Sequence, residues 1–220
     1  MRVLDLFCNA GGAATGYARA GFEVVGVDVN PQPNYPFTFI KMDALEVHWT
    51  TFGFDLIHAS PPCQHSAAIT KGTNKHRRHL HPNLYPQVKA LLERTGKPYV
   101  IENPDSRPDV VLCGEMFGLG VIRHRNFELG NWSTVKPAHP KHRGYVRGMR
   151  HGVVRDGPYV AVYGKGGGKA TVPEAQRAMG IDWTDVHEEL VEMLPPAYTQ
   201  WIGERFAEWH RKERACCPSS

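Results

Sequence analysis

The chain has 220 residues, of which 41% are hydrophobic and 22% are charged, and its net charge is +4. These values fit one globular α/β domain, and they exclude a membrane protein because no apolar run approaches spanning length. The N-terminus predicts a strand rather than a signal peptide, and the five cysteines form no CxxC pair. We therefore expect a reduced, cytoplasmic setting without a disulfide framework or a cysteine-based zinc site.

The first part of the chain alternates short apolar runs with one helical segment. Residues 3–7 predict a strand, residues 8–12 a turn of small residues, and residues 13–20 a helix that Gly21 ends. Further strands are predicted at 22–27, which ends at Asp28, before Asp43, and at 54–58. This order of strands and helices predicts an α/β fold with a doubly wound, mostly parallel sheet.

Polar residues follow the predicted strands. Asp28, Asp43, Cys63 and Glu102 each come after an apolar run. Ligands of such sheets bind beyond the carboxyl ends of the strands, so these four side chains are expected to line one cleft. Cys63 follows two prolines that fix the backbone of its turn. Alone, that turn fits a nucleophile and a small buried hydrophobic residue equally well.

The turn at residues 8–12 suggests a nucleoside-type ligand. Gly11 and Gly12 allow close approach of a ligand, but the turn is neither a GxGxxG motif nor a phosphate loop. An acid at the end of the second strand, here Asp28, typically binds a ribose diol. Asp43 could accept from an adenine amino group, or equally cap a helix, and Phe7 could pack on the adenine. The pattern predicts an adenosine-containing ligand that need not carry a pyrophosphate.

The second half of the chain continues the same architecture. We expect a basic loop at 65–82, a helix at 84–95, a strand at 99–101 that leads into Glu102, a helix that starts at Thr171, and a final helix at 197–211. The glycine-rich stretch 164–169 predicts a flexible connection. Residues 212–220 are expected to form a disordered tail.

Basic charge is concentrated in residues 131–170. This segment holds eight Lys or Arg and one acid, a net +7 in a chain of net +4, so the remainder carries −3. Aromatic residues Trp132, Tyr145 and Tyr159 lie between the basic ones. The combination favours a nucleic-acid partner over a merely solvated loop.

Ordered motifs resemble those of the C5-cytosine DNA methyltransferases. They are the run from Asp5 to Gly12, Pro61-Pro62-Cys63-Gln64, Glu102-Asn103, Arg123-His124-Arg125, and the later stretches 173–180 and 194–203. The resemblance implies a Rossmann-like fold that binds S-adenosylmethionine. It also implies a catalytic domain of residues 1–130 and 171–211, with 131–170 as a short target-recognition insertion.

Site roles follow from the same resemblance. Cys63 corresponds to the nucleophile, Glu102 to the acid that holds the cytosine ring, and Arg123 and Arg125 to the basic pair beside it. The cofactor positions are Phe7, Ala10, Gly11, Gly12, Asp28, Val29, Asp43, Ala44, Pro62 and Leu84. The nucleic-acid contacts are expected at Gln64, Ser66, Lys71, Arg77, Arg78, Lys141, Arg143, Arg147 and Arg150.

The implied chemistry requires a cytosine outside the base stack. A base inside a duplex is out of reach, so it is flipped out, and the basic loop at 65–82 is expected to close over it. Double-stranded DNA is the expected partner of a monomeric enzyme. No metal is expected: arginines interleave with His76, His79 and His81, which favours phosphate contacts, and Cys113 is expected in the core.

Departures from the family pattern leave alternatives open. Asn9 stands where the family has glycine, which asparagine suits if its φ is left-handed. Glu204 stands where the family has asparagine, and could alter donor contacts or point away. The short insertion predicts a short recognition sequence, as in a compact phage or mobile-element enzyme. An RNA or cytidine-nucleotide acceptor, and a catalytically silent nucleic-acid-binding protein, are the competing hypotheses.

Overall fold

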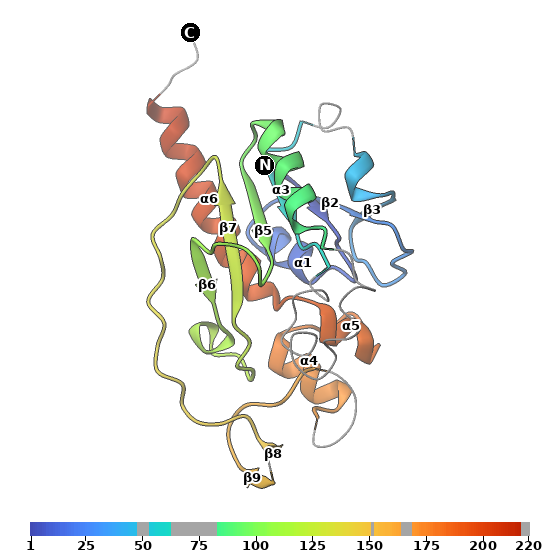
Figure 1. Ribbon diagram of the computed structural model, residues 1–220, viewed down its shortest axis with the longest axis vertical. Helices are drawn as coiled ribbons and strands as arrows, with labels where there is room; N and C mark the ends of the chain where they lie inside the picture. The colour runs from blue at the N-terminus through green and yellow to red at the C-terminus, as the bar shows by residue number, and fades with distance from the viewer. Residues whose placement is uncertain (48–52, 63–82, 151, 164–168, 217–220) are drawn as a thin grey trace.

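The computed structural model of the chain describes residues 1–47, 53–62, 83–150, 152–163 and 169–216 (Figure 1). Within these residues the central element is a seven-stranded sheet of order β3-β2-β1-β4-β5-β7-β6. Its strands are β1 (Arg2–Leu6), β2 (Glu23–Asp28), β3 (Thr38–Lys41), β4 (Leu56–Ala59), β5 (Tyr99–Glu102), β6 (Val110–Leu112) and β7 (Arg125–Gly130).

Strands β3, β2, β1, β4 and β5 are parallel to their neighbours, and β7 is antiparallel to both β5 and β6. The predicted α/β fold with a doubly wound, mostly parallel sheet is confirmed. The chain adds β2 and β3 on one side of β1, and then β4 and β5 on the other side. Such sheets open a crevice for a ligand at this switch point, between β1 and β4. The sequence did not reveal the reversed strand β7.

Helices cover both faces of the sheet. Helices α1 (Gly12–Arg19) and α6 (Pro196–Cys216) pack on one face, and α3 (Tyr85–Thr95) packs on the other. Successive strand residues point to opposite faces, so Val3 joins the α1 and α6 side while Leu4 joins the α3 side. A third apolar cluster gathers around α4 (Val172–Met179) and α5 (His187–Glu192).

Close contact between α1 and α6 depends on one glycine. A Cβ atom at Gly16 would lie 2.0 Å from Thr199 Oγ1 and 2.1 Å from the Pro196 carbonyl oxygen. Any side chain there would separate the helices. Thr199 uses the approach to donate a hydrogen bond of 2.8 Å to the Ala13 carbonyl.

One expectation for the later chain needs correction. The tail expected at 212–220 is helical through residue 216, because Arg211, Lys212, Glu213 and Arg214 are good helix formers that extend α6. Within the 131–170 segment, Tyr159 makes an isolated bridge to Val146. Thr171 does begin a helix as expected, with the Thr171 and Glu174 side chains forming a capping box.

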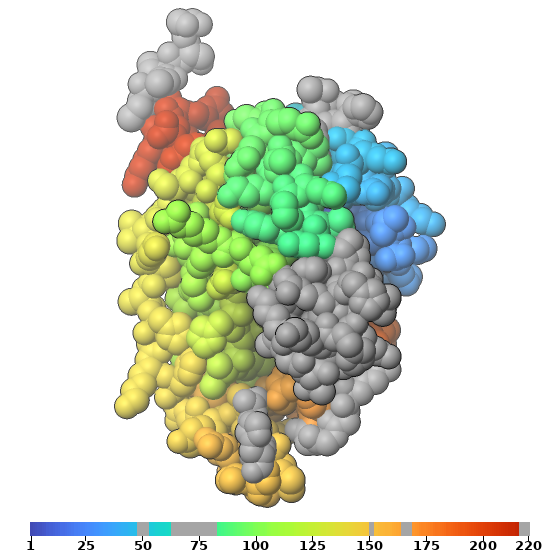
Figure 2. Space-filling model, in the orientation of Figure 1, coloured from blue at the N-terminus to red at the C-terminus, as the bar shows by residue number. Residues whose placement is uncertain are grey.

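The segment after β7 runs along the edge of the molecule as a long loop to the hairpin of β8 (Gly148–Arg150) and β9 (Val153–Arg155) (Figure 1). In the space-filling view it borders one side of the visible face (Figure 2). A short helix η1 (Ala44–Glu46) follows β3, and η4 (Gly114–Phe117) follows β6. Among the described residues, no helix has the length and apolar character needed to cross a membrane.

Candidate active site

A cavity of about 980 Å³ opens at the carboxyl ends of the parallel strands. Residues from the ends of β1, β2, β4 and β5 contribute to its wall, as does the start of β7. Of the residues expected at the cofactor, eight line it: Phe7, Gly12, Asp28, Val29, Asp43, Ala44, Pro62 and Leu84. The cavity is also lined by Glu102, Arg123 and Arg125.

The turn after β1 carries backbone strain beside this cavity. Phe7 has a φ of 59° and Asn9 a φ of 45°, both in the left-handed region that residues other than glycine rarely adopt. The expected left-handed Asn9 is therefore observed. Asp28 stabilises the turn, since its Oδ2 accepts from the Asn9 amide at 3.2 Å and its Oδ1 from the Asn30 amide at 2.9 Å. Strain held in place by a neighbouring carboxylate is typical of ligand-binding loops.

Ala10 and Gly11 are not in the cavity wall. The Ala10 side chain is buried, and its carbonyl oxygen accepts from Trp183 Nε1 at 2.7 Å. Gly11 has a φ of 89°, and a Cβ there would lie 2.8 Å from Pro36 Cδ. These two residues shape the turn. Gly12 does line the cavity, and a Cβ on it would lie 2.4 Å from the Leu194 carbonyl oxygen.

Asp43 caps a helix and also lies in the cavity wall, so the cap does not remove it from the site. Its Oδ1 accepts from the Leu45 amide at 2.9 Å and so caps η1, while the residue also lines the cavity. Glu204 does not line the cavity. It accepts from Gln200 Nε2 at 3.1 Å within α6, so it points away from the site.

Helix α5 forms an acidic wall that sequence reasoning missed. Glu188, Glu189 and Glu192 line the cavity, and Asn9 Nδ2 donates to Glu192 at 3.0 Å. Asn34 Nδ2 donates to Glu189 at 3.0 Å. With Asp28 and Asp43 these carboxylates favour a cationic ligand on this side. The only signal in the sequence is a cluster of glutamates, which is common on solvated helices.

Glu102 and Arg125 meet at the other side of the cavity. Because β7 is antiparallel to β5, its first residue lies at the edge where β5 ends, and Arg125 Nε is 3.2 Å from Glu102 Oε1. Burial raises the pKa of Glu102 above its ordinary value, and Arg125 and Arg123 partly offset the shift. The site therefore holds a carboxyl that accepts a proton more readily than an exposed one.

Arg123 joins separate segments near Glu102. Its guanidinium donates to the Val162 carbonyl at 3.1 Å and to the Val191 carbonyl, and its own carbonyl accepts from Tyr198 Oη at 2.6 Å. These bonds tie the acidic wall to the start of β7. Arg123 thus positions the cavity wall as well as lining it.

The turn that precedes Cys63 is held from two sides. Asn103 Nδ2 donates to the Pro61 carbonyl at 3.2 Å, and the Ser60 amide donates to the Leu6 carbonyl at 3.2 Å. His58 bridges Tyr17 Oη and Ser60 Oγ at 3.0 Å each, and burial lowers the pKa of His58 to about 3. The expected residues Cys63, Gln64, Ser66, Lys71, Arg77 and Arg78 lie outside the described part of the chain.

Two arginines expected at nucleic acid form ion pairs within the protein. Arg143 Nε is 2.8 Å from Glu115 Oε1, and Arg147 pairs with Glu174 at the start of α4. Both pairs hold residues of the 131–170 segment to the rest of the molecule. Lys141 is exposed, and the Arg150 side chain is outside the described structure.

A cluster of potential metal ligands lies in a part of the chain where the sequence indicated no metal site. The structure brings Cys113, His124, His139 and His142 together, with one ligand atom of each within 4.8 Å of the others. Cys113 is buried as expected, but its sulfur lies 3.6 Å from His142 Nε2. No CxxC pair marks this group, because its residues come from three separate segments of the chain.

Replacing Asp5 by asparagine is expected to favour the unliganded folded state more at pH 8 than at about pH 5, and the difference in the free energy of unfolding is on the order of 4 kcal/mol. Burial, and then the charge of Asp28, raise the pKa of Asp5 from 3.8 to about 8. The folded state therefore retains a proton that the unfolded state releases, so stability falls as pH rises from 3.8 to about 8. Asparagine removes this dependence.

Urea unfolding of both proteins across that range measures the effect. The opposite contribution of His58, whose stability is lost as pH falls below its ordinary pKa, is common to both proteins and cancels in the difference. Parallel pH profiles for the two proteins would contradict the prediction.

Comparison with known proteins agrees with the fold and the motifs. Residues 1–104 match the model of the family described as C-5 cytosine-specific DNA methylase. The type II methyltransferase M.HgiGI of Herpetosiphon aurantiacus is 34% identical over 83 residues, which span 32% of this chain and 66% of the relative.

Solved structures share the whole fold at low sequence identity. A protein described as a DNA modification methyltransferase, encoded within a prophage of E. coli, superposes with a TM-score of 0.62 at 13% identity, over 96% of this chain and 99% of that one. A mutant DNMT2 of Spodoptera frugiperda gives a TM-score of 0.64 at 13% identity, over 94% and 99%. Dnmt2 methyltransferase of S. pombe gives 0.62 at 13% identity, over 94% and 98%. Residues 1–104 therefore carry the motifs of the C-5 cytosine-specific DNA methylase family.

Proposed function

We propose that this protein transfers a methyl group from S-adenosylmethionine to C5 of a cytosine in DNA, through a covalent bond between Cys63 and C6 of the base. One observation carries the proposal. A single cavity joins Asp28 and Asp43 to Glu102 and Arg125, and the Pro61-Pro62 turn that precedes Cys63 lies in its wall. Donor and acceptor sites that share one cavity are what a direct transfer needs.

The residues on the donor side fit S-adenosylmethionine. Asp28 accepts from the ribose hydroxyls, Phe7 packs on the adenine, and Asp43 lies within reach of its amino group. The acidic wall of α5 suits the positive charges of the sulfonium and amino groups. When bound, this donor supplies an electrophilic methyl group.

The residues on the acceptor side perform the covalent step. The Cys63 thiolate would add to C6, and the electrons of the C5–C6 bond would form the new bond from C5 to the methyl carbon as the bond from that carbon to the sulfonium sulfur breaks and S-adenosylhomocysteine leaves. Glu102 supplies or shares a proton at N3 of the ring, which its raised pKa favours, and Arg125 holds the O2 side. Loss of the C5 proton to a base then breaks the bond from Cys63 to C6 and restores the thiolate.

The segment 131–170 serves as the target-recognition insertion of a catalytic domain made of 1–130 and 171–211. Its hairpin exposes Met149, Val153 and Val154, and Arg155 stacks over Tyr145 at 4.5 Å. Exposed apolar side chains beside arginines suit contact with DNA bases and phosphates. Lys141 and Arg150 contact the DNA from this segment, whereas Arg143 and Arg147 reach it only while their ion pairs with Glu115 and Glu174 hold the segment in place. Gln64, Ser66, Lys71, Arg77 and Arg78 contact the DNA from the residues after Cys63.

Labelled methyl transfer tests the proposal. The protein is incubated with radiolabelled S-adenosylmethionine and, in parallel, duplex DNA, single-stranded DNA, RNA and dCMP, with Cys63→Ser as control. We expect label in duplex DNA as 5-methylcytosine, and none with the Cys63→Ser protein. Label in RNA or dCMP alone would show that DNA is not the acceptor. Absence of label from all four acceptors would overturn the enzymatic function.

A further inference from the structure

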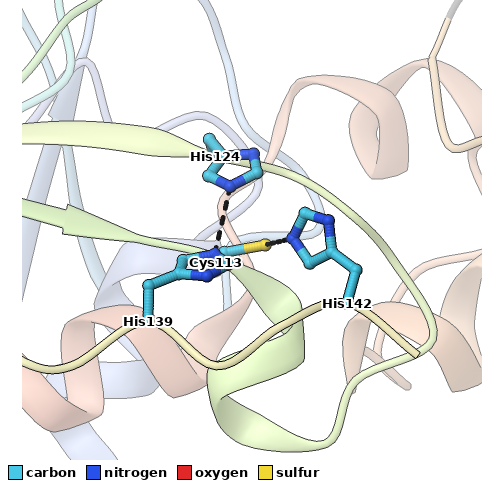
Figure 3. Close-up of side chains that lie close together, drawn as sticks. All are labelled: Cys113, His124, His139 and His142. Carbon is cyan, nitrogen blue, oxygen red and sulfur yellow. Dashed lines mark hydrogen bonds between the residues drawn. The ribbon is translucent and has the colours of Figure 1, made fainter. Parts of the chain in front are cut away.

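Four potential metal ligands converge from three separate segments of the chain (Figure 3). Cys113 follows β6, His124 precedes β7, and His139 and His142 belong to the long loop that follows β7. The side chains of all four point toward one another. His124 Nε2 lies 3.1 Å from His139 Nε2, and Cys113 Sγ lies 3.6 Å from His142 Nε2.

These separations are close to those between the ligands of a zinc ion. For a tetrahedron with Zn–N bonds of about 2.05 Å and a Zn–S bond of about 2.3 Å, two nitrogens lie about 3.3 Å apart and sulfur lies about 3.6 Å from nitrogen. All four ligand atoms of the cluster are within 4.8 Å of one another. The His124–His139 and Cys113–His142 separations of 3.1 Å and 3.6 Å are already close to the tetrahedral values.

The donor set selects the metal. One thiolate and three imidazoles are the borderline-soft ligands that zinc takes, whereas Mg²⁺ and Ca²⁺ require oxygen ligands. Four protein ligands complete the tetrahedral coordination, which is the arrangement of structural zinc sites.

We propose that Cys113, His124, His139 and His142 bind a structural Zn²⁺ that holds the loop after β7 to the edge of the sheet. The loop begins at the end of β7 and leads to the β8–β9 hairpin. A metal at this point fixes its course halfway along. His124 lies between Arg123 and Arg125, so the same ion restrains the backbone of both arginines at the cavity.

Packing and hydrogen bonds beside the cluster also attach the long loop to the rest of the molecule. The His142 ring lies 6.3 Å from the Tyr159 ring, and Tyr159 Oη donates to Glu115, which also pairs with Arg143. The cluster therefore has a packed, hydrogen-bonded support on the side of the loop. Such surroundings orient ligand side chains and strengthen metal binding.

Metal analysis of the purified full-length protein tests the inference. We expect about one zinc ion per chain, and a lower melting temperature after removal of zinc by a chelator. His139→Ala, which alters an exposed loop residue, is expected to lose the zinc and to have a melting temperature insensitive to chelator. His210→Ala, which removes a histidine of α6 outside the cluster, is the matched control and is expected to keep the zinc.

Cobalt substitution identifies the ligands by a signal independent of activity. Co²⁺ bound to a thiolate gives a charge-transfer absorption in the near ultraviolet, which we expect in the wild-type protein and not in Cys113→Ser. Absence of both zinc and a cobalt signal would overturn the proposal and leave a hydrogen-bonded cluster. Retention of zinc by both His139→Ala and Cys113→Ser would place the metal elsewhere and overturn it equally.

Discussion

Methyl transfer by the Glu102→Gln protein is expected to fall by a factor of about 10² to 10⁴, the usual contribution of a general acid. Glutamine keeps the size of the side chain and an oxygen that can accept from Arg125. It cannot give a proton to N3 of the cytosine or share one with it. Burial already raises the pKa of Glu102 in the unliganded site, so the wild-type residue is prepared for this role.

Single-turnover methyl transfer and calorimetric binding of S-adenosylmethionine together isolate this effect. Donor affinity should be unchanged, because Asp28 and α5 are untouched. Glu128→Gln is the matched control. Glu128 is a buried glutamate of β7 that accepts from Tyr85 Oη at 2.5 Å and pairs with Lys89. It does not line the cavity. Equal losses of activity in both variants would show that burial of a glutamine, rather than the lost proton, is responsible.

Replacing Asp28 by asparagine is expected to weaken binding of S-adenosylmethionine. A hydrogen bond to a charged group contributes about 1.5–3 kcal/mol, which corresponds to a Kd about 10- to 150-fold higher. Asp28 lies at the end of β2, and its two oxygens already accept from the amides of Asn9 and Asn30. Asparagine keeps one of these acceptors, so the turn is damaged less than by alanine.

Calorimetry and the melting temperature distinguish lost ligand contact from lost structure. Asp43→Asn is the comparison, and we expect a smaller change in Kd because Asp43 also caps η1 through one oxygen. An unchanged Kd for Asp28→Asn with a stable fold would contradict the assignment of Asp28 to the ribose. It would then leave Asp28 as a residue that only shapes the turn after β1.

Much of the fold could be predicted because its signals are local. The parallel strands are short and mostly apolar, and β2 and β5 end in the polar residues Asp28 and Glu102. The alternation of strands with helices implies their parallel packing. The prediction that polar residues gather at strand ends follows from the same geometry. Thr171 and Glu174 likewise marked a helix start through local capping.

The remainder depends on contacts between distant parts of the chain. Nothing near Arg125 indicates that β7 runs antiparallel, yet this direction places Arg125 beside Glu102. The glutamates of α5 become a cavity wall only after α5 packs against the turn that carries Asn9. The His139-x-x-His142 spacing was the one local sign of the Cys/His cluster, and its partners lie at positions 113 and 124.

The covalent step is tested most directly with a DNA duplex that carries 5-fluorocytosine at the methylated position. Fluorine cannot leave C5 as a cation, so the bond from Cys63 to C6 would persist after methyl transfer. With S-adenosylmethionine present, we predict a protein–DNA adduct whose mass spectrum places the link on the peptide containing Cys63. Formation of 5-methylcytosine in ordinary duplex without any adduct on the fluorinated one would contradict the mechanism.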